Sequence, residues 1–344
     1  MGGDSAALVR EVLEEYGGDV RRLLRTYLRP PEPRSDVYEF ASDYPERGGR
    51  TLRASLCIAA ARAHGANLEQ VLNSAVALEL VHNAFLIHDD IEDESEERRG
   101  RPTLHRLLGV PIAVNVGDAL IALSLRPLLA NRHSLGPRLS MRILEEAERM
   151  VRETVEGQAL ELSWRHANVL QLETEDYLRM ILKKTCWYTS IYPCRVGAVI
   201  GTRDGAALDC FTRFGFFLGA AFQIQDDLLN LDGDPVRYGK ELGGDVWEGK
   251  RTLMLIHASN HAEPPERLEL RRILALERAA RTPDDVRWVT NLMRARGSID
   301  YARTLGHALA GAACHEFHRS FGHLPDSRDK RFLEALPSWV IERT

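Results

Sequence analysis

Apolar residues recur along most of this chain at intervals of three and four, which is the period of an amphipathic α-helix. The pattern first appears over residues 5–28, where the apolar positions include Leu8, Val9, Val12, Leu13, Val20, Leu23 and Leu24. Prolines follow at positions 30, 31 and 33, and proline ends a helix because its ring removes a backbone donor. We therefore predict a helix over residues 5–28 and a loop from there to about Gly48.

The same period continues toward the C-terminus with short interruptions. Helices are predicted over residues 51–64, from residue 68 into an acidic cluster near residue 90, and over 112–130, 138–166, 174–202, 205–232, 251–260, 264–280, 283–296, 298–320 and 328–342. Residues 94–110 contain Gly100, Pro102 and Gly109 and are predicted to form a loop with a short helical insert. No persuasive run of alternating apolar and polar residues appears, so the predicted fold is all-α.

The helices are expected to form one domain. No repeat of fixed period and no low-complexity linker divides the 344 residues. A bundle of about 10 to 13 helices with short connections is more economical as one domain than as two. We predict a single domain over residues 1–344, with residues 1–45 as a peripheral helix and loop.

Composition excludes several classes of protein. A net charge of −5 gives no general electrostatic attraction for nucleic acid. The five cysteines show neither CxxC spacing nor a His/Cys cluster, as is typical of a reduced protein without a zinc site, and we expect a cytoplasmic location. The N-terminal residues are acidic where a signal peptide needs a basic region and an apolar core. No uninterrupted apolar run approaches about 18 residues, so no membrane span is expected.

Two acidic clusters carry the first chemical signal. Asp89, Asp90 and Asp93 close one apolar helix, and Asp226, Asp227 and Asn230 repeat the same spacing at the end of another. On a helix, residues four apart share a face, so Asp89 and Asp93 could bind one cation from the same side. A single acidic run is usually a solvated helix face. Two such clusters that follow buried-looking sequence instead favour Mg²⁺, which binds carboxylates and commonly shares its ligand shell with substrate phosphates.

Basic residues lie near both clusters. Most basic residues of any protein are solvated surface charges. Here, however, they gather close to the acidic clusters and after the Gly48-Gly49 turn: Arg50, Arg53, Arg98, Arg99, Lys183, Lys184, Lys240, Lys250 and Arg251. Arginine binds phosphate oxygens in pairs, so the combination suggests a diphosphate substrate, and the apolar helices suggest that it carries an apolar tail.

These residues carry a resemblance to a known family. The segments HDDIED and RRGRPT, Lys184-Thr185, FQIQDDLLN, GKELGGD and EGKRT resemble those of the trans-isoprenyl diphosphate synthases (polyprenyl synthetases), and particularly the geranylgeranyl type. The likeness runs from Gly48 to the GSIDYA segment at 297–302. It implies the isoprenoid synthase fold, an all-α bundle around a central cavity for the prenyl chain, and a homodimer.

The resemblance also implies a role for each matching residue. Two Mg²⁺ ions would be bound by Asp89 and Asp93 and a third by Asp226, with Asp90 and Asp227 nearby. The residues that would hold the allylic diphosphate are Arg98, Lys184 and Lys240. Those that would hold isopentenyl diphosphate are Arg50, Arg53, His82 and Arg99. Thr185 and Gln223 would direct dipoles at the developing cation, and Lys250 would assist from the rim.

The implied reaction is electrophilic. Mg²⁺ and basic side chains stabilise the diphosphate that leaves the allylic substrate, and the double bond of isopentenyl diphosphate traps the cation. Two positions depart from the family pattern: GGKR is replaced by Gly48-Gly49-Arg50-Thr51, which loses one basic residue, and Asn230 replaces the last acid of the second cluster. Asn230 would keep an oxygen ligand without charge.

Product length is assigned to the helix before Asp89. In the family a bulky residue one turn before the first aspartate can form the floor of the tail cavity, and here Phe85 is that residue while Ala84 leaves a gap. This pair suggests a product of intermediate length, geranylgeranyl diphosphate first.

Two other functions are weighed against the synthase. A terpene cyclase on the same scaffold would need no second diphosphate site, and the retention of Arg50, Arg53, His82 and Arg99 argues against it. A non-catalytic modulating subunit would be expected to have lost an acidic cluster, and this chain keeps five of the six acids.

Overall fold

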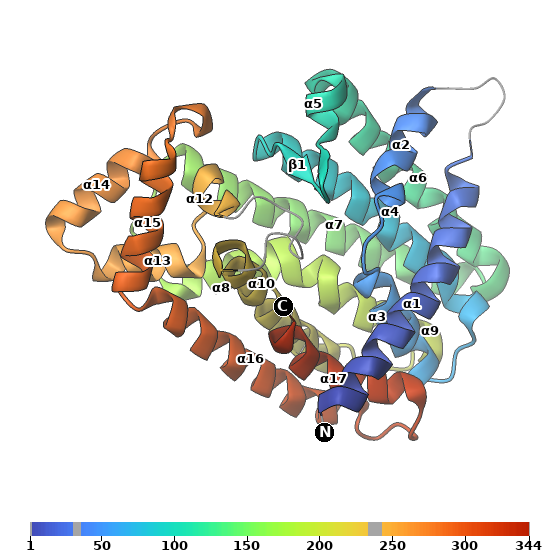
Figure 1. The fold of residues 1–344 in the computed structure, drawn as a ribbon. Helices are drawn as coiled ribbons and strands as arrows, with labels where there is room; N and C mark the ends of the chain where they lie inside the picture. Colours follow the sequence, from blue (N-terminus) through green and yellow to red (C-terminus); the bar gives the residue numbers. More distant parts are fainter. Residues whose placement is uncertain (1, 30–35, 233–242, 344) are drawn as a thin grey trace.

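Helix α4 (Leu68–Glu92) forms the core of the helical bundle in the computed structural model, which describes residues 2–29, 36–232 and 243–343 (Figure 1). It begins with a capping box in which the side chains of Asn67 and Gln70 each accept a hydrogen bond from the other residue's backbone N–H. Fourteen of its residues are buried, because neighbouring helices pack around it on several sides. The helix carries the first acidic cluster at its C-terminal end.

The N-terminal helices cover one side of α4. Helices α1 (Gly2–Tyr27) and α3 (Leu52–Ala63) confirm the predicted elements, but the predicted loop up to Gly48 is wrong over α2 (Asp36–Glu46). Helix α2 forms because Ala41 and Tyr44 bury their side chains against α4 and α6 (Val110–Leu135), which the proline-rich context concealed. The three prolines at 30, 31 and 33 lie outside the described residues.

A small hairpin follows α4. Strands β1 (Glu97–Arg98) and β2 (Arg101–Pro102) pair antiparallel, so the prediction of no strand is wrong here. Arg99 and Gly100 both have positive φ, 55° and 71°, as a two-residue type I′ turn requires. The predicted helical insert is confirmed as α5 (Leu104–Leu108).

The middle of the chain forms further α-helices. They are α6 (Val110–Leu135), α7 (Pro137–His166), α8 (Thr174–Ile181), α9 (Tyr192–Thr202) and α10 (Asp209–Asp232). Of these, α6 and α9 pack against α4. The predicted helix over 174–202 is present, but its centre is the π-helix η1 (Leu182–Ile191). Glycine allows neighbouring helices to approach this segment closely: a Cβ at Gly157 of α7 would lie 2.2 Å from the backbone nitrogen of Lys184.

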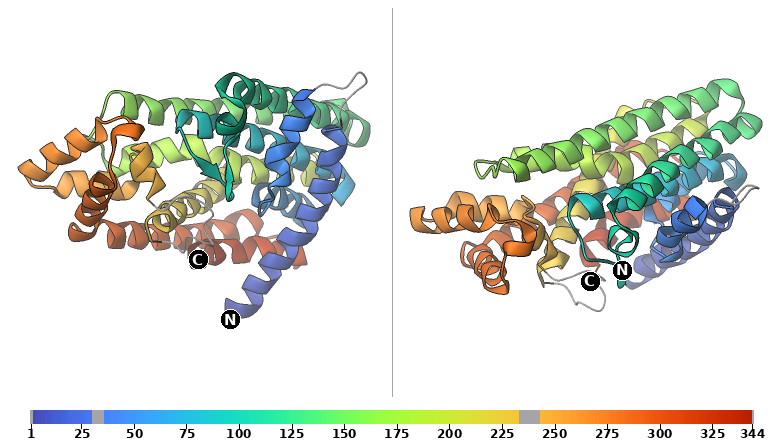
Figure 2. Two further views of the ribbon diagram at one scale, coloured as in Figure 1. Left: turned by 45° about the horizontal axis from the view of Figure 1, so that its top comes forward. Right: turned by 90° about the horizontal axis from the view of Figure 1, so that it is seen from above.

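The C-terminal part completes the bundle. It contains α12 (Gly244–Glu248), α13 (Leu253–His261), α14 (Pro264–Leu274), the 3₁₀-helix η2 (Arg278–Ala280), α15 (Pro283–Ala295), α16 (Ser298–Phe321) and α17 (Arg328–Glu342). Helix α16 packs along α10, and α17 packs against α1 and α3. Helices α14 and α15 lie at the end of the molecule remote from α1 (Figure 2). The all-α fold predicted from the sequence is confirmed.

Among the residues that the structure describes, two helices, α4 and α6, are long and apolar enough to cross a membrane by length and composition. In α4, 72% of the apolar window is buried inside the protein, as in a core helix, but in α6 only 44% is buried. The expected absence of a membrane span stays a prediction.

Candidate active site

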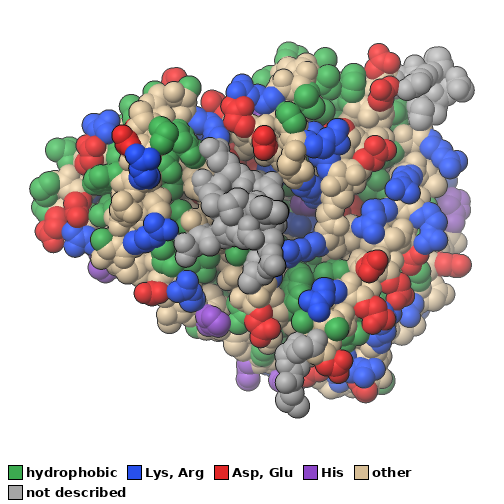
Figure 3. Space-filling view, viewed as in Figure 1, with side chains coloured by type: hydrophobic (Ala, Val, Ile, Leu, Met, Phe, Trp, Pro, Cys, Tyr) green, Lys and Arg blue, Asp and Glu red, His purple; other side chains and the backbone are tan. Residues whose placement is uncertain are grey.

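Two adjoining cavities lie on either side of the junction formed by Arg53, His82 and Phe222, which line both. The first cavity has a volume of about 570 Å³ and lies between α1, α2, α3 and α4. We call it the arginine cavity, because its lining residues include Arg50 and Arg99. The second, of about 500 Å³ between α4, α7, η1 and α10, is the acidic cavity; it is lined by Asp89, Glu92, Lys184, Asp226 and Asp227, among others. Lys and Arg side chains border a hollow on this face of the molecule (Figure 3).

Asp89 and Asp93 lie at the C-terminal end of α4. The helix dipole is negative there, so carboxylates at this end need cations nearby. Lys184 Nζ lies 3.2 Å from Asp89 Oδ1, and Asp93 is paired with Arg165 Nη1 at 2.5 Å and Lys250 Nζ at 2.6 Å. Burial and the charge of Asp89 raise the pKa of Asp93 to about 7, although Lys250 opposes the shift. Lys250 therefore lies beside the first cluster, and not only at the rim.

Asp90 points away from the acidic cavity. Its carboxylate is fully buried and accepts hydrogen bonds from Tyr44 OH at 2.5 Å and Arg98 Nε at 2.9 Å. Burial of Arg98 opposes its charge, but Asp90 outweighs this and raises the pKa of the guanidinium. Asp90 thus orients Arg98, which does line the acidic cavity.

The second cluster lies in the last turns of α10. Asp226 is paired with Arg343 at 2.7 Å, and Asp227 accepts hydrogen bonds from Tyr177 OH at 2.8 Å and Gln223 Nε2 at 2.7 Å. Burial, followed by the charge of Asp245, raises the pKa of Asp227 well above its usual range. All of these side chains except Arg343 line the acidic cavity.

Thr185, Gln223 and Asn230, which were also predicted as site residues, lie on or beside α10. Thr185 Oγ1 donates to Gln223 Oε1 at 2.9 Å, which brings the two predicted dipoles together. Asn230 is buried, and its Oδ1 accepts the backbone N–H of Asp245 at 3.1 Å, so this oxygen serves the chain and not the cavity. Lys240 lies outside the described residues.

Helix α7 supplies site residues that the sequence reasoning missed. Gln158 Nε2 donates to Glu92 Oε2 at 2.6 Å, Glu161 pairs with Lys184, and Arg165 pairs with Asp93. Burial opposes the charge of Lys184, but the carboxylates of Glu161 and Asp89 raise its pKa. The available signal was the spacing of these polar residues at i, i+3 and i+7, which places them on one face of the helix.

Lys183, by contrast, faces away from the acidic cavity and pairs with Glu153 at 2.9 Å and Glu156 at 2.5 Å. Arg251 is buried and donates to the carbonyl oxygens of Val169 and Gly249, and it also lines the acidic cavity.

The acidic cavity offers oxygen ligands for a hard cation. In the part of the chain that the structure describes, no group of three Asp, Glu, His or Cys side chains is close enough to hold an ion by itself. Mg²⁺ is, however, usually bound by one or two carboxylates together with waters and phosphate oxygens. Asp89 from α4 and Asp226 from α10 both line the cavity, with 21% and 34% of their side chains exposed. These donors fit Mg²⁺ ions shared with a diphosphate.

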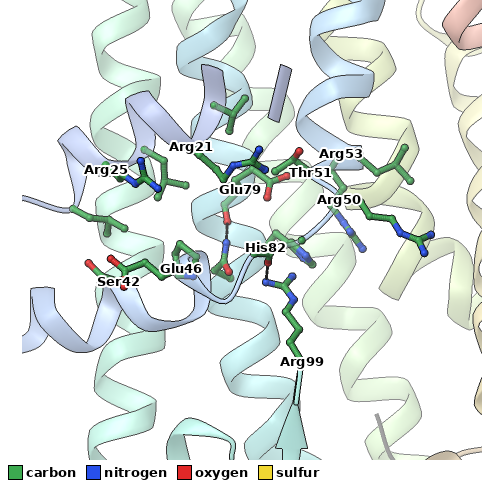
Figure 4. A pocket seen from close by; sticks show the side chains of 18 of the residues that line it. Arg21, Arg25, Ser42, Glu46, Arg50, Thr51, Arg53, Glu79, His82 and Arg99 are labelled. Carbon is green, nitrogen blue, oxygen red and sulfur yellow. Dashed lines mark hydrogen bonds between the residues drawn. The ribbon is translucent and has the colours of Figure 1, made fainter. Parts of the chain in front are cut away.

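The β1–β2 hairpin divides its two arginines between the cavities. Arg98 lines the acidic cavity, whereas Arg99 lines the arginine cavity (Figure 4). Arg99 also donates to the carbonyl oxygens of Gly48 and Tyr44. Glycine at position 49 permits this approach, because a Cβ there would lie 2.8 Å from Arg99 Nη2. Two adjacent residues can therefore serve two anion sites.

The remaining predicted residues of the arginine cavity lie on α3, on the segment before it and on α4. Arg50 is exposed and lies 5.6 Å from the Trp339 ring centroid, and Arg53 Nη2 donates to Tyr188 OH at 2.9 Å. Burial, and then Arg53 and the other nearby arginines, lower the pKa of His82 well below its usual value, so the imidazole is neutral. Its Nδ1 is buried without a hydrogen-bond partner among the described residues and is free to bind a ligand.

The two tail-length residues have different positions. Phe85 lines the acidic cavity and meets the Tyr188 ring edge to face, with centroids 5.9 Å apart. Ala84 is fully buried and does not line the cavity, so its side chain lies on the packed face of α4.

Comparison with known proteins gives consistent matches. Residues 34–293 match the family described as polyprenyl synthetase. The chain is 29% identical to the geranylgeranyl pyrophosphate synthase of Geoglobus acetivorans over 98% of this chain and 99% of that protein. It is 31% identical to the octaprenyl diphosphate synthase of Escherichia coli over 86% of each.

Solved structures agree with these matches. The polyprenyl synthase from Caulobacter crescentus, complexed with calcium and isoprenyl diphosphate, has a TM-score of 0.86 at 29% identity and covers 98% of both chains. The geranylgeranyl pyrophosphate synthase from Corynebacterium glutamicum, complexed with isoprenyl diphosphate and magnesium, has a TM-score of 0.82 at 26% identity over both full chains.

Proposed function

This chain belongs to the polyprenyl synthetase family and is a trans-prenyltransferase, and we propose that it condenses an allylic diphosphate with isopentenyl diphosphate to give a longer all-trans prenyl diphosphate. The observation that carries the proposal is the pair of cavities joined at Arg53, His82 and Phe222. One diphosphate would lie in each cavity, and the two reacting carbons would meet at the junction.

Mg²⁺ is the proposed cofactor. The oxygen donors of Asp89 and Asp226 in the acidic cavity support it, as do the calcium and magnesium complexes of the two similar structures. Asp93, which the family pattern also assigns to Mg²⁺, is paired with Arg165 and Lys250 and does not line the cavity. When bound, Mg²⁺ neutralises the charge that develops on the departing diphosphate. We propose three Mg²⁺ ions per active site.

The protein's own groups do the remaining work in the acidic cavity. Lys184 and Arg98 are held by Glu161 and Asp90 and would present fixed positive charge to the allylic diphosphate. Gln223 donates to Asp227, which leaves its carbonyl end beside the Thr185 hydroxyl. These two oxygens would stabilise the allylic cation by their dipoles.

In the arginine cavity, Arg50, Arg53 and Arg99 with neutral His82 would bind the diphosphate of isopentenyl diphosphate. A cyclase has no use for this second anion site, and a non-catalytic subunit has no use for two acidic clusters. The geometry therefore favours the synthase over both alternatives.

The proposed product is geranylgeranyl diphosphate. Phe85 lines the acidic cavity and would limit the length of the prenyl tail. The similar enzymes include both geranylgeranyl and octaprenyl synthases, so family membership alone does not set the product length. Phe85→Ala should shift the product to longer chains, measured as prenyl alcohols after dephosphorylation. An unchanged product distribution would remove Phe85 from the floor of the cavity.

A homodimer is the proposed assembly. Helices α6 and α7 lie side by side along one edge of the molecule (Figure 2), and both expose large apolar side chains. These are Val110, Ile112, Val114, Leu125 and Leu129 on α6 and Met141 and Val155 on α7. A second copy of the chain would cover this face.

The test of the function is a direct assay. The purified protein is incubated with Mg²⁺, isopentenyl diphosphate and dimethylallyl, geranyl or farnesyl diphosphate, and the products are identified by mass. Elongated prenyl alcohols are expected, with loss of turnover in Asp89→Ala and Asp226→Ala but little unfolding. A hydrocarbon formed without isopentenyl diphosphate would exclude the synthase, and near-normal turnover in either variant would exclude its metal assignment.

A further inference from the structure

Helix α1 forms one wall of the arginine cavity, and none of its residues was predicted from the sequence to be functional. Val20, Arg21, Leu24 and Arg25 of this helix line the cavity. Figure 3 shows Lys and Arg side chains, with Asp and Glu side chains among them, on the face that carries the hollow. The wall therefore combines apolar packing with positive charge.

Arg21 folds back toward Thr51. Gly17, one turn earlier on α1, leaves room for this: a Cβ at Gly17 would lie 2.3 Å from Thr51 Oγ1 and 2.9 Å from Arg21 Nη1. The guanidinium and the hydroxyl thus share the space that any larger residue at position 17 would fill. Figure 4 shows Arg21, Thr51 and Glu79 turned toward one another.

Thr51 is the position at which this chain lacks a basic residue of the GGKR pattern. It adopts the left-handed conformation with φ of 47°, and its Oγ1 is buried without a hydrogen-bond partner among the described residues. The side chain therefore contributes no charge to the cavity, and its hydroxyl remains available as a donor.

The side chains that line the arginine cavity carry more positive than negative charge, so Arg21 is not needed there only to balance a carboxylate. Seven arginines and two glutamates line it among the described residues. Glu79, which is 6% exposed, faces Arg21, Arg53 and Arg99, and one carboxylate cannot balance three guanidinium groups. Such an excess of positive charge fits a diphosphate, which binds arginine through paired hydrogen bonds.

From this arrangement we infer that Arg21 is a further diphosphate-binding residue and that it supplies, from α1, the positive charge missing at Thr51. The inference rests on the proposed function for the identity of the ligand, isopentenyl diphosphate. The competing role for Arg21 is purely structural, namely neutralising Glu79.

Calorimetric titration with isopentenyl diphosphate and with inorganic diphosphate, each without an allylic substrate, tests the inference independently of turnover. Arg21→Ala should weaken both ligands about tenfold, as expected for loss of one charge-assisted contact. In the assay the KM for isopentenyl diphosphate should rise by a similar factor, with kcat and the KM for the allylic substrate little changed. Arg22→Ala is the matched control, because Arg22 is exposed on the same helix and pairs with Asp19 outside the cavity.

Two double variants separate binding from a structural role. Adding Thr51→Arg to Arg21→Ala should restore much of the affinity, whereas adding Glu79→Gln should not. Restored affinity in the Arg21→Ala/Glu79→Gln double variant would overturn the inference. Wild-type affinity in Arg21→Ala would overturn it as well. If the wild-type protein binds diphosphate through Arg21 but forms no elongated product, the proposed function fails while the anion-binding role of Arg21 stands.

Discussion

The three aspartates of the first acidic cluster have different surroundings despite their proximity in the sequence. Asp89 lines the acidic cavity, Asp90 faces the core, and Asp93 is covered by Arg165 and Lys250. Helical spacing was enough to predict that Asp89 and Asp93 share a face. It could not reveal that Arg165 also pairs with Asp93, because Arg165 comes from a segment far away in the chain.

This difference predicts separate effects of two conservative substitutions. Asp90→Asn should destabilise the protein by about 3 kcal/mol, because the buried Arg98 loses its nearest counter-ion and keeps only Asp89, at 3.4 Å. Asp89→Asn should leave the free energy of unfolding nearly unchanged but reduce turnover strongly. Urea denaturation and the prenyltransfer assay measure the two effects; equal stability of both variants would contradict the assignment of Asp90 to the core.

His82 predicts a pH dependence of stability. Its pKa in the unfolded chain is near 6.5, and burial followed by the nearby arginines lowers it in the folded protein. As the pH falls, the unfolded state therefore binds the proton first. The stability that neutral His82 contributes to the free energy of unfolding is present above pH 6.5 and is lost below it. The slope from one such group is at most about 1.4 kcal/mol per pH unit.

His82→Gln should remove this part of the pH dependence, because glutamine stays neutral. The free energy of unfolding, measured in urea at pH 7 and at about pH 5, should fall less in the variant than in the wild type. The same fall in both proteins would show that His82 is not the group responsible.

At the scale of elements, the periodicity predicted most helices but missed features that depend on packing. Helix α2 was predicted as a loop, since its short apolar face is stabilised by α4 and α6 and is flanked by prolines. The π-helix η1 was read as ordinary helix, because the extra residue in its turn leaves little trace in an apolar sequence. Both features position site residues: Tyr44 on α2 and Lys184 on η1.

The close approach of α7 to η1 predicts a remote effect on the site. Gly157→Ala would place a methyl group 2.2 Å from the backbone nitrogen of Lys184 and force the helices apart. We expect a loss of about 1–3 kcal/mol of stability and at least about a tenfold loss of turnover, because Lys184 and Thr185 move. Gly311→Ala on α16 is the control: a Cβ there meets nothing within 4 Å, so it should stabilise the protein slightly. Similar behaviour of the two variants would contradict the prediction.

At the scale of the whole molecule, the fold class and the order of the helices could be predicted from the sequence. The division of the site into two cavities could not, because it depends on how α1, α3 and the hairpin pack around α4. For the same reason, Arg21 gave no signal in the sequence.

The exposed apolar face of α6 predicts the assembly. Leu125 and Leu129 are 47% and 57% exposed on successive turns, and their joint replacement by Asp should convert a dimer into a monomer in sedimentation velocity. Leu268→Asp is the matched control, because Leu268 is 71% exposed on α14, far from this face. A monomeric wild type, or dissociation by Leu268→Asp, would contradict the proposed interface.

The type I′ turn of the β1–β2 hairpin also has a thermodynamic consequence. Arg98 and Arg99 share one peptide bond, so a ligand that draws either guanidinium toward it fixes the backbone that carries the other. The affinities of the two substrates should therefore be linked, and this linkage is reciprocal. If the first ligand raises the affinity for the second by some factor, the second raises the affinity for the first by the same factor. A bound allylic diphosphate would thus prepare the site for its reaction partner.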